Sequence, residues 1–151
     1  MRVAFINGSP RKSNSISLKL LRALEERLPG CEISRGWDTP GEAIVIAFPL
    51  YVDSLPSNLL RELEAHETGL PPGTPVYALA NNGFYEGEQN AIAIAILRNW
   101  SLRAGLAWGQ GAGLGGAMVS AEATTREGNI MRPQVALRGA CSLWFEIGPL
   151  V

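Results

Sequence analysis

Cysteine and histidine are scarce in this 151-residue chain, which contains two cysteines and one histidine. Cys31 and Cys141 lie far apart and match neither a metal-ligand spacing nor a Cys-x-x-Cys motif. His66 has no second ligand in view, so we interpret it as a polar position on a helix. These patterns argue against a metal centre, an iron–sulfur cluster and a catalytic triad. A structural disulfide is compatible with the two cysteines, but a reducing cytoplasm is the simpler setting.

The chain also lacks a large excess of charge of either sign, and it lacks long apolar runs. The net charge is −1, and the acidic and basic residues are scattered along the chain. This distribution gives no electrostatic footprint for nucleic acid or an anionic membrane. The first apolar run, residues 3–6, is too short for a signal peptide, and no run reaches the length of a membrane span. We therefore expect neither a nucleic-acid partner nor a membrane partner.

Apolar residues make up 46% of the chain, which is typical of a globular protein, and the length predicts one domain over residues 1–151. Strand and helix patterns alternate. We expect strands at 3–6, 31–34, 43–48, 76–80 and 106–109, and helices at 16–28, from Ser57 onward, at 88–104 and at 133–145. Residues 35–41 leave no room for a crossover helix. Either that crossover is a loop or the second strand is marginal.

The loop from Gly8 to Ser15 follows the first strand and precedes the first helix. In open α/β sheets, ligands bind in the crevice at the carboxyl ends of the strands. First-turn helix amides lack internal partners and carry partial positive charge, so they suit a phosphate group. Additional donors are the side chains of Ser9, Arg11, Ser13, Asn14 and Ser15. The alternative is an ordinary turn in which Ser13, Asn14 or Ser15 only caps the helix.

The sequence Asn7-Gly8-Ser9-Pro10-Arg11, followed by Ser13-Asn14-Ser15, resembles the first loop of the flavodoxin-like NAD(P)H-dependent FMN reductases. In that family, these elements surround the FMN phosphate. The resemblance covers roughly residues 2–108. It implies a flavodoxin-like α/β fold, a three-layer sandwich around a parallel five-stranded sheet of order 2-1-3-4-5.

Two further loops carry the same resemblance. Pro49-Leu50-Tyr51 is similar to the segment that lies along the isoalloxazine ring in these flavoproteins. Asn81-Asn82-Gly83-Phe84-Tyr85 is similar to their third loop, whose backbone amides reach the pyrimidine edge of the flavin. The resemblance therefore implies that both loops bracket the ring. For Tyr51, Phe84 and Tyr85, simple packing in the core or in an interface is the alternative.

The implied function is an FMN-dependent oxidoreductase that passes electrons from NADH or NADPH to a small acceptor, such as a quinone, a free flavin, or an azo or nitro compound. Because the flavin carries the electrons, no catalytic side chain and no metal are expected. The alternative is a non-enzymatic protein, either a one-electron carrier or a flavodoxin-like module that has lost flavin and acts through oligomerisation.

Two features of the C-terminal half give further predictions. Gly111, Gly113 and Gly116 match Gly-x-Gly-x-x-Gly, but too little chain follows for a dinucleotide-binding half, so we expect a mobile glycine loop beside the flavin. The helix at 88–104 is apolar around its circumference. This predicts a homodimer or homotetramer, with an exposed edge near Trp100 and Trp108.

Overall fold

The computed structural model describes residues 1–39, 41–116 and 143–147. The strands are β1 (Arg2–Asn7), β2 (Glu32–Arg35), β3 (Ala43–Pro49), β4 (Pro75–Asn81), β5 (Ala107–Leu114) and β6 (Leu143–Ile147). The helices are α1 (Ile16–Glu25), α2 (Ser57–Ala65), the 3₁₀ helix η1 (Gly87–Asn90) and α3 (Ala91–Arg103).

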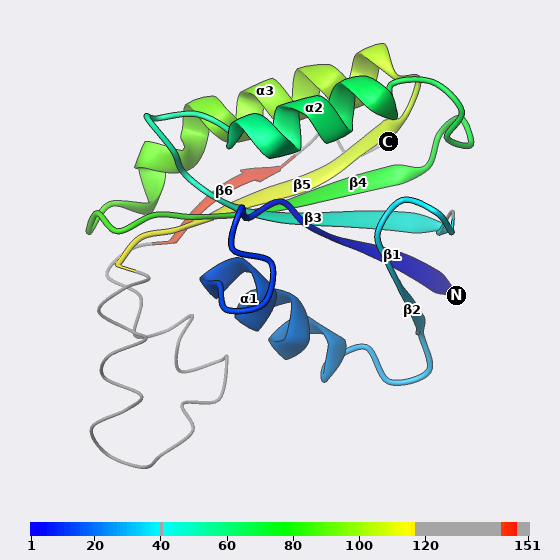
Figure 1. Cartoon of the computed structure of the whole chain (residues 1–151), viewed down its shortest axis with the longest axis horizontal. Coiled ribbons are helices and arrows are strands. Elements are labelled where there is room, and N and C mark those ends of the chain that lie inside the picture. Colours follow the sequence, from blue (N-terminus) through cyan, green and yellow to red (C-terminus); the bar gives the residue numbers. More distant parts are fainter. Residues whose placement is uncertain (40, 117–142, 148–151) are drawn as a thin grey trace.

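The sheet has the order β2-β1-β3-β4-β5-β6. The first five strands pair in parallel, and β6 pairs antiparallel with β5. Helix α1 covers one face of the sheet, and α2 and α3 cover the other (Figure 1). The predicted flavodoxin-like order 2-1-3-4-5 is therefore confirmed, with an antiparallel strand added at the β5 edge.

The central strands β1 and β3 are buried because their side chains are apolar on both faces, as expected for strands covered by helices on either side. On the α2 and α3 face, Phe48 packs in one cluster with Leu59 and Leu97, and all three are fully buried. On the α1 face, Phe5 packs with Leu21 in a second cluster. Two cores thus hold the helices to the sheet and fix where its loops project.

The connection between β2 and β3 is a loop: its described residues, 36–39 and 41–42, form no helix. Trp37 anchors this short crossover. Its ring stacks on His66 just after α2, with ring centroids 4.6 Å apart, and meets Trp100 of α3 edge-on at 6.0 Å. Of the two alternatives left by the sequence, a loop crossover with a formed second strand is the one observed.

Strand β5 extends further than predicted, and it includes glycines that the sequence placed in a mobile loop. Gly111 and Gly113 pair with β4, so the prediction of a loop at these two positions is wrong. A Cβ atom on Gly113 would lie 2.5 Å from the carbonyl oxygen of Gly87, and one on Gly111 would collide with Ile94. Glycine is needed here because η1 and α3 approach the strand closely.

The predicted closing helix at 133–145 is wrong over residues 143–145, which belong to β6. The outer edge of β5 presents backbone N–H and C=O groups, and β6 pairs with them. This pairing decides the structure of residues 143–145, although the spacing of the apolar residues from 133 to 145 is helical. Residues 133–142, including Cys141, lie outside the described residues.

The helix predicted at 88–104 is confirmed as η1 followed by α3. Trp100 and Trp108, near which the sequence predicts an exposed edge, are themselves buried, at 4% and 8% exposed. The indole N–H of Trp100 donates to the carbonyl of Leu63 at 2.8 Å, which ties α3 to α2. The large apolar side chains that α3 does expose are Ile92, Ile96 and Leu102. None of the described helices has the length and apolar content of a membrane span.

Candidate functional site

Three loops leave the carboxyl ends of neighbouring parallel strands and lie at the same edge of the sheet (Figure 1). We name them loop 1 (residues 8–15, after β1), loop 2 (residues 50–56, after β3) and loop 3 (residues 82–86, after β4). This edge is where open α/β sheets bind ligands. The predicted site residues therefore converge on one end of the sheet.

Loop 1 is organised by Asn7, the last residue of β1. Its side-chain oxygen accepts from the backbone N–H of Ser9 at 3.1 Å. Its amide group donates to the carbonyl of Lys12 at 3.0 Å. The Ser9 hydroxyl in turn accepts from the N–H of Arg11 at 3.2 Å. These bonds fold the chain back on itself, so the loop shape is set by the protein alone.

The second half of loop 1 leaves its backbone donors free. Within the part of the chain that the structure describes, the backbone N–H groups of residues 12–15 donate no hydrogen bond. Ser15 is the N-cap of α1, and its hydroxyl accepts from the N–H of Leu18 at 3.1 Å. The capping alternative therefore accounts for Ser15 but leaves these amides unexplained. Consecutive unpaired amides at a helix N-terminus form a cradle that fits a phosphate group.

The two cations of loop 1 are placed differently. Lys12 donates to the carbonyl of Asn7 at 2.9 Å and forms an ion pair with Glu62 of α2 at 3.0 Å. Arg11 is exposed and forms no ion pair with a described residue. The side chains of Ser13 and Asn14 are likewise exposed. Arg11 is thus the loop 1 cation that is available to an anion.

Loop 2 contains a tight turn. Tyr51 and Ser54 exchange backbone hydrogen bonds of 2.9 and 3.0 Å, and the two residues between them, Val52 and Asp53, have φ angles of 49° and 56°. A β-branched residue such as valine rarely adopts this left-handed conformation. Tyr51 is 44% exposed at the base of the turn. The turn therefore presents an aromatic ring at the site edge at some cost in backbone strain.

Loop 3 is held by two buried asparagines. The Asn81 amide donates to the carbonyl of Phe48 at 2.9 Å and to the hydroxyl of Ser17 at 3.0 Å, which links β4 to β3 and α1. The Asn82 oxygen accepts from the N–H of Phe84 at 2.9 Å. Both asparagine side chains are therefore used inside the protein, and they shape the site rather than line it.

The predicted site residues divide into three groups by their exposure. Those at the surface are Arg11, Ser13, Asn14, Tyr51, Gly83, Phe84 and Tyr85, and those buried in the loop framework are Ser9, Ser15, Asn81 and Asn82. Pro49 and Leu50 are half-buried between them. Sequence reasoning missed the framework roles of Asn7, Lys12 and Glu62. Asn7 carried one signal, because it is the polar residue that ends an apolar strand.

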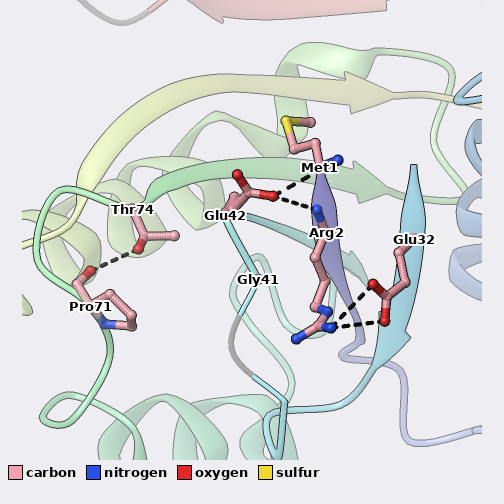
Figure 2. A pocket seen from close by; sticks show the side chains of 7 residues that line it. All are labelled: Met1, Arg2, Glu32, Gly41, Glu42, Pro71 and Thr74. Carbon is pink, nitrogen blue, oxygen red and sulfur yellow. Dashed lines mark hydrogen bonds and ion pairs between the residues drawn. The ribbon is translucent and has the colours of Figure 1, made fainter. Parts of the chain in front are cut away.

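Two cavities lie away from the exposed aromatic side chains. One, of about 480 Å³, is at the opposite edge of the sheet and is lined by residues at the amino ends of strands (Figure 2). Its charged groups already have partners, since the Arg2 guanidinium binds Glu32 at 3.0 Å and Glu42 accepts from the backbone N–H of Arg2 at 2.7 Å. The other, of about 240 Å³, lies beside loop 1 and is lined partly by Lys12 and Glu62. Among the described residues, no group of histidine, cysteine and carboxylate side chains is arranged to hold a metal ion.

Comparison with known proteins defines the fold class. No family model and no curated protein sequence matches the chain. Among solved structures, it is similar to the flavoenzyme NAD(P)H:(acceptor) oxidoreductase FerB from Paracoccus denitrificans, at 22% identity and a TM-score of 0.59, covering 71% of this chain and 74% of that chain. It is similar to the apo form of the NADH:FMN oxidoreductase EMOB, at 17% identity and a TM-score of 0.57, covering 73% of each chain.

A third similar structure is the flavodoxin, WrbA-like protein from Agrobacterium tumefaciens, at 9% identity and a TM-score of 0.55, covering 71% of this chain and 75% of that chain. Likeness at these identities shows the fold: the chain has a flavodoxin-like α/β architecture.

Proposed function

We propose that this protein is an FMN-dependent oxidoreductase that passes electrons from NADH or NADPH to a small acceptor, such as a quinone, a flavin, or an azo or nitro compound. The observation that carries the proposal is in loop 1, where the N–H groups of residues 12–15 and the Arg11 guanidinium have no partner within the part of the chain that the structure describes. This cradle is at the same sheet edge as loops 2 and 3, which carry three exposed aromatic side chains, Tyr51, Phe84 and Tyr85. A phosphate site and aromatic surfaces at one edge fit a ligand with a phosphate and a flat ring.

The residues have separate tasks in this proposal. The backbone amides of residues 12–15 bind the phosphate together with Arg11, Ser13 and Asn14. Pro49, Leu50, Tyr51, Gly83, Phe84 and Tyr85 contact the ring and exclude water from one of its faces. Ser9, Ser15, Asn81 and Asn82 keep the loops in place through their hydrogen bonds. Bound FMN supplies the electron-transfer chemistry, so no protein side chain has to act as acid, base or nucleophile.

The structures that are similar by fold support this reading, because two of them are described as an NAD(P)H:(acceptor) oxidoreductase and an NADH:FMN oxidoreductase. The proposal also includes a homo-oligomer, since α3 exposes Ile92, Ile96 and Leu102. A reducing cytoplasm is part of it, because Cys31 is a free thiol among the described residues.

Anaerobic mixing tests the proposed reaction directly. The purified chain is loaded with FMN and mixed with NADH or with NADPH, and the flavin absorbance near 450 nm is followed. We expect bleaching within seconds and recovery of the absorbance when a quinone is added. If FMN binds but neither nucleotide bleaches it, the protein is an electron carrier and the reductase proposal is wrong. If no FMN binds, the site assignment is wrong as well.

A further inference from the structure

Helix α2 contacts loop 1 at two positions that are one helical turn apart. The Asn58 amide donates to the carbonyl of Gly8 at 3.1 Å. Four residues later, a Glu62 carboxylate oxygen accepts from the ammonium group of Lys12 at 3.0 Å. Residues spaced by four lie on the same helix face. One face of α2 therefore holds loop 1 near its start and near its middle.

Lys12 closes the loop in two ways. Its ammonium group donates to the carbonyl of Asn7 at 2.9 Å, and its own carbonyl accepts from the Asn7 amide at 3.0 Å. The backbone at Lys12 begins the run of free N–H groups that extends to residue 15. The Lys12 side chain and the Lys12 backbone are therefore both tied to Asn7, at the position where this run of N–H groups begins.

Glu62 is itself fixed from a second side. Its other carboxylate oxygen accepts from the indole N–H of Trp37 at 3.0 Å. Trp37 stacks on His66, which follows α2, and meets Trp100 of α3 edge-on, so its ring is held by both helices. The Glu62 side chain is 29% exposed, against 57% for Lys12. A surface ion pair alone stabilises little. Here, however, the hydrogen bond from Trp37 already fixes the Glu62 carboxylate, so less side-chain freedom is lost when it pairs with Lys12.

We propose that Glu62 is a positioning residue for the phosphate cradle. Through Lys12, it holds the backbone of loop 1 in the shape that the hydrogen bonds of Asn7 and Ser9 define, and it does so without contacting the ligand. Pre-organisation of this kind raises affinity because less ordering is needed when the ligand binds. The inference rests on the proposed function for its ligand, since it assigns Glu62 a role in binding the phosphate of FMN but not the ring.

Flavin titrations measure this selectivity. Wild type, Glu62→Gln and the control Glu64→Gln are titrated with FMN and with riboflavin, and the quenching of flavin fluorescence gives each Kd. Glutamine keeps the size of the side chain, but its amide nitrogen accepts no hydrogen bond, so either Lys12 or Trp37 loses its partner. Glu64 is on the same helix with an exposed side chain. We expect Glu62→Gln to raise the Kd of FMN by about threefold to thirtyfold, with little change for riboflavin and none for the control.

A second measurement needs no ligand. In ¹H–¹⁵N NMR spectra of the free protein, the amide signals of residues 12–15 should shift and broaden in Glu62→Gln and Lys12→Met, but not in Glu64→Gln. The proposal is overturned if these signals stay unchanged, or if Glu62→Gln weakens FMN and riboflavin binding equally, which is what a merely structural role produces. If the wild type binds neither flavin, the proposed function fails, and the NMR comparison alone decides whether Glu62 positions the loop.

Discussion

Neighbouring cations in loop 1 have different roles. Lys12 is engaged by Asn7 and Glu62, whereas Arg11 has no ion-pair partner among the described residues. A guanidinium that is free beside unpaired amides can form charge-assisted hydrogen bonds with a phosphate. At the scale of single residues, a substitution of Arg11 should therefore change ligand binding with little effect on the stability of the fold.

We predict that Arg11→Ala removes charge-assisted hydrogen bonds worth about 1.5–3 kcal/mol from FMN binding. The Kd of FMN should then rise by roughly one to two decades. Riboflavin, which lacks the phosphate, should bind almost as before. Fluorescence titrations with both ligands check this, and Arg27→Ala, at another exposed cation, is the control. Equal losses for the two ligands would show that Arg11 acts through the fold.

Val52 gives a second prediction at this scale. Its φ of 49° is unfavourable for a β-branched residue, and its side chain is 98% exposed, so packing does not compensate. Asparagine tolerates this conformation well. We expect Val52→Asn to raise the free energy of unfolding by about 1 kcal/mol, measured by urea denaturation. Val52→Ala, which keeps a Cβ atom, should gain less, and a destabilised Val52→Asn variant would contradict the presence of strain.

At the scale of elements, the sequence predicted what depends on local pattern. The apolar runs of β1 and β3 predicted buried strands because unbroken apolar segments suit strands covered on both faces. The polar residues of loop 1 predicted a cradle at the helix start. The resemblance implies that the backbone of Asn81 and Asn82 reaches the ring, and this stays a prediction. Their side chains bond to Phe48, Ser17 and loop 3, a role that the sequence did not indicate. The spacing of residues in the sequence predicts that a residue lies at the carboxyl edge of the sheet, but it does not predict the direction of its side chain.

Long-range packing explains the predictions that were wrong. Gly111, Gly113 and Gly116 match a glycine-rich pattern, and glycine is disfavoured in strands, so these positions indicated a loop. The close approach of η1 and α3, which no local pattern encodes, requires glycine there. In the same way, Trp37 has no sequence signal as an anchor, because its partners His66 and Trp100 are distant in the chain.

The glycines of β5 make a testable pair. A Cβ on Gly113 would meet the Gly87 carbonyl, which is backbone, whereas a Cβ on Gly109 would meet the ring of Tyr77, which is 38% exposed and free to turn away. We expect Gly113→Ala to lower the free energy of unfolding by about 1–3 kcal/mol through overpacking, and Gly109→Ala to lower it less. Thermal or urea unfolding measures both, and equal effects would contradict the argument from close approach.

At the scale of the whole molecule, the two ends of the sheet differ in how their polar groups are satisfied. At the amino-terminal edge, Arg2, Glu32 and Glu42 bond to one another and to the chain (Figure 2). At the carboxyl edge, the amides of residues 12–15 and the Arg11 side chain have no such partners among the described residues. The outer surface of α3 is a third distinct region, since Ile92, Ile96 and Leu102 are exposed on it.

This α3 surface gives the last prediction. Single exposed apolar residues are common on proteins, but Ile92 and Ile96 are one turn apart, and they are 64% and 36% exposed. A two-fold dimer that packs α3 against its copy would remove both from water. We expect sedimentation velocity to show a dimer at micromolar concentration, and the double variant Ile92→Lys/Ile96→Lys to be a monomer because like charges would then face each other across the axis.

The matched control is Leu60→Lys on α2, where leucine is 37% exposed and lies outside this surface. This variant should remain dimeric, because its added positive charge, one lysine against two, lies on α2 and not on α3. A monomeric wild type would rule out the dimer. A double variant that stays dimeric would show that the chain associates through another face, and the exposure of Ile92 and Ile96 would then be an ordinary surface feature.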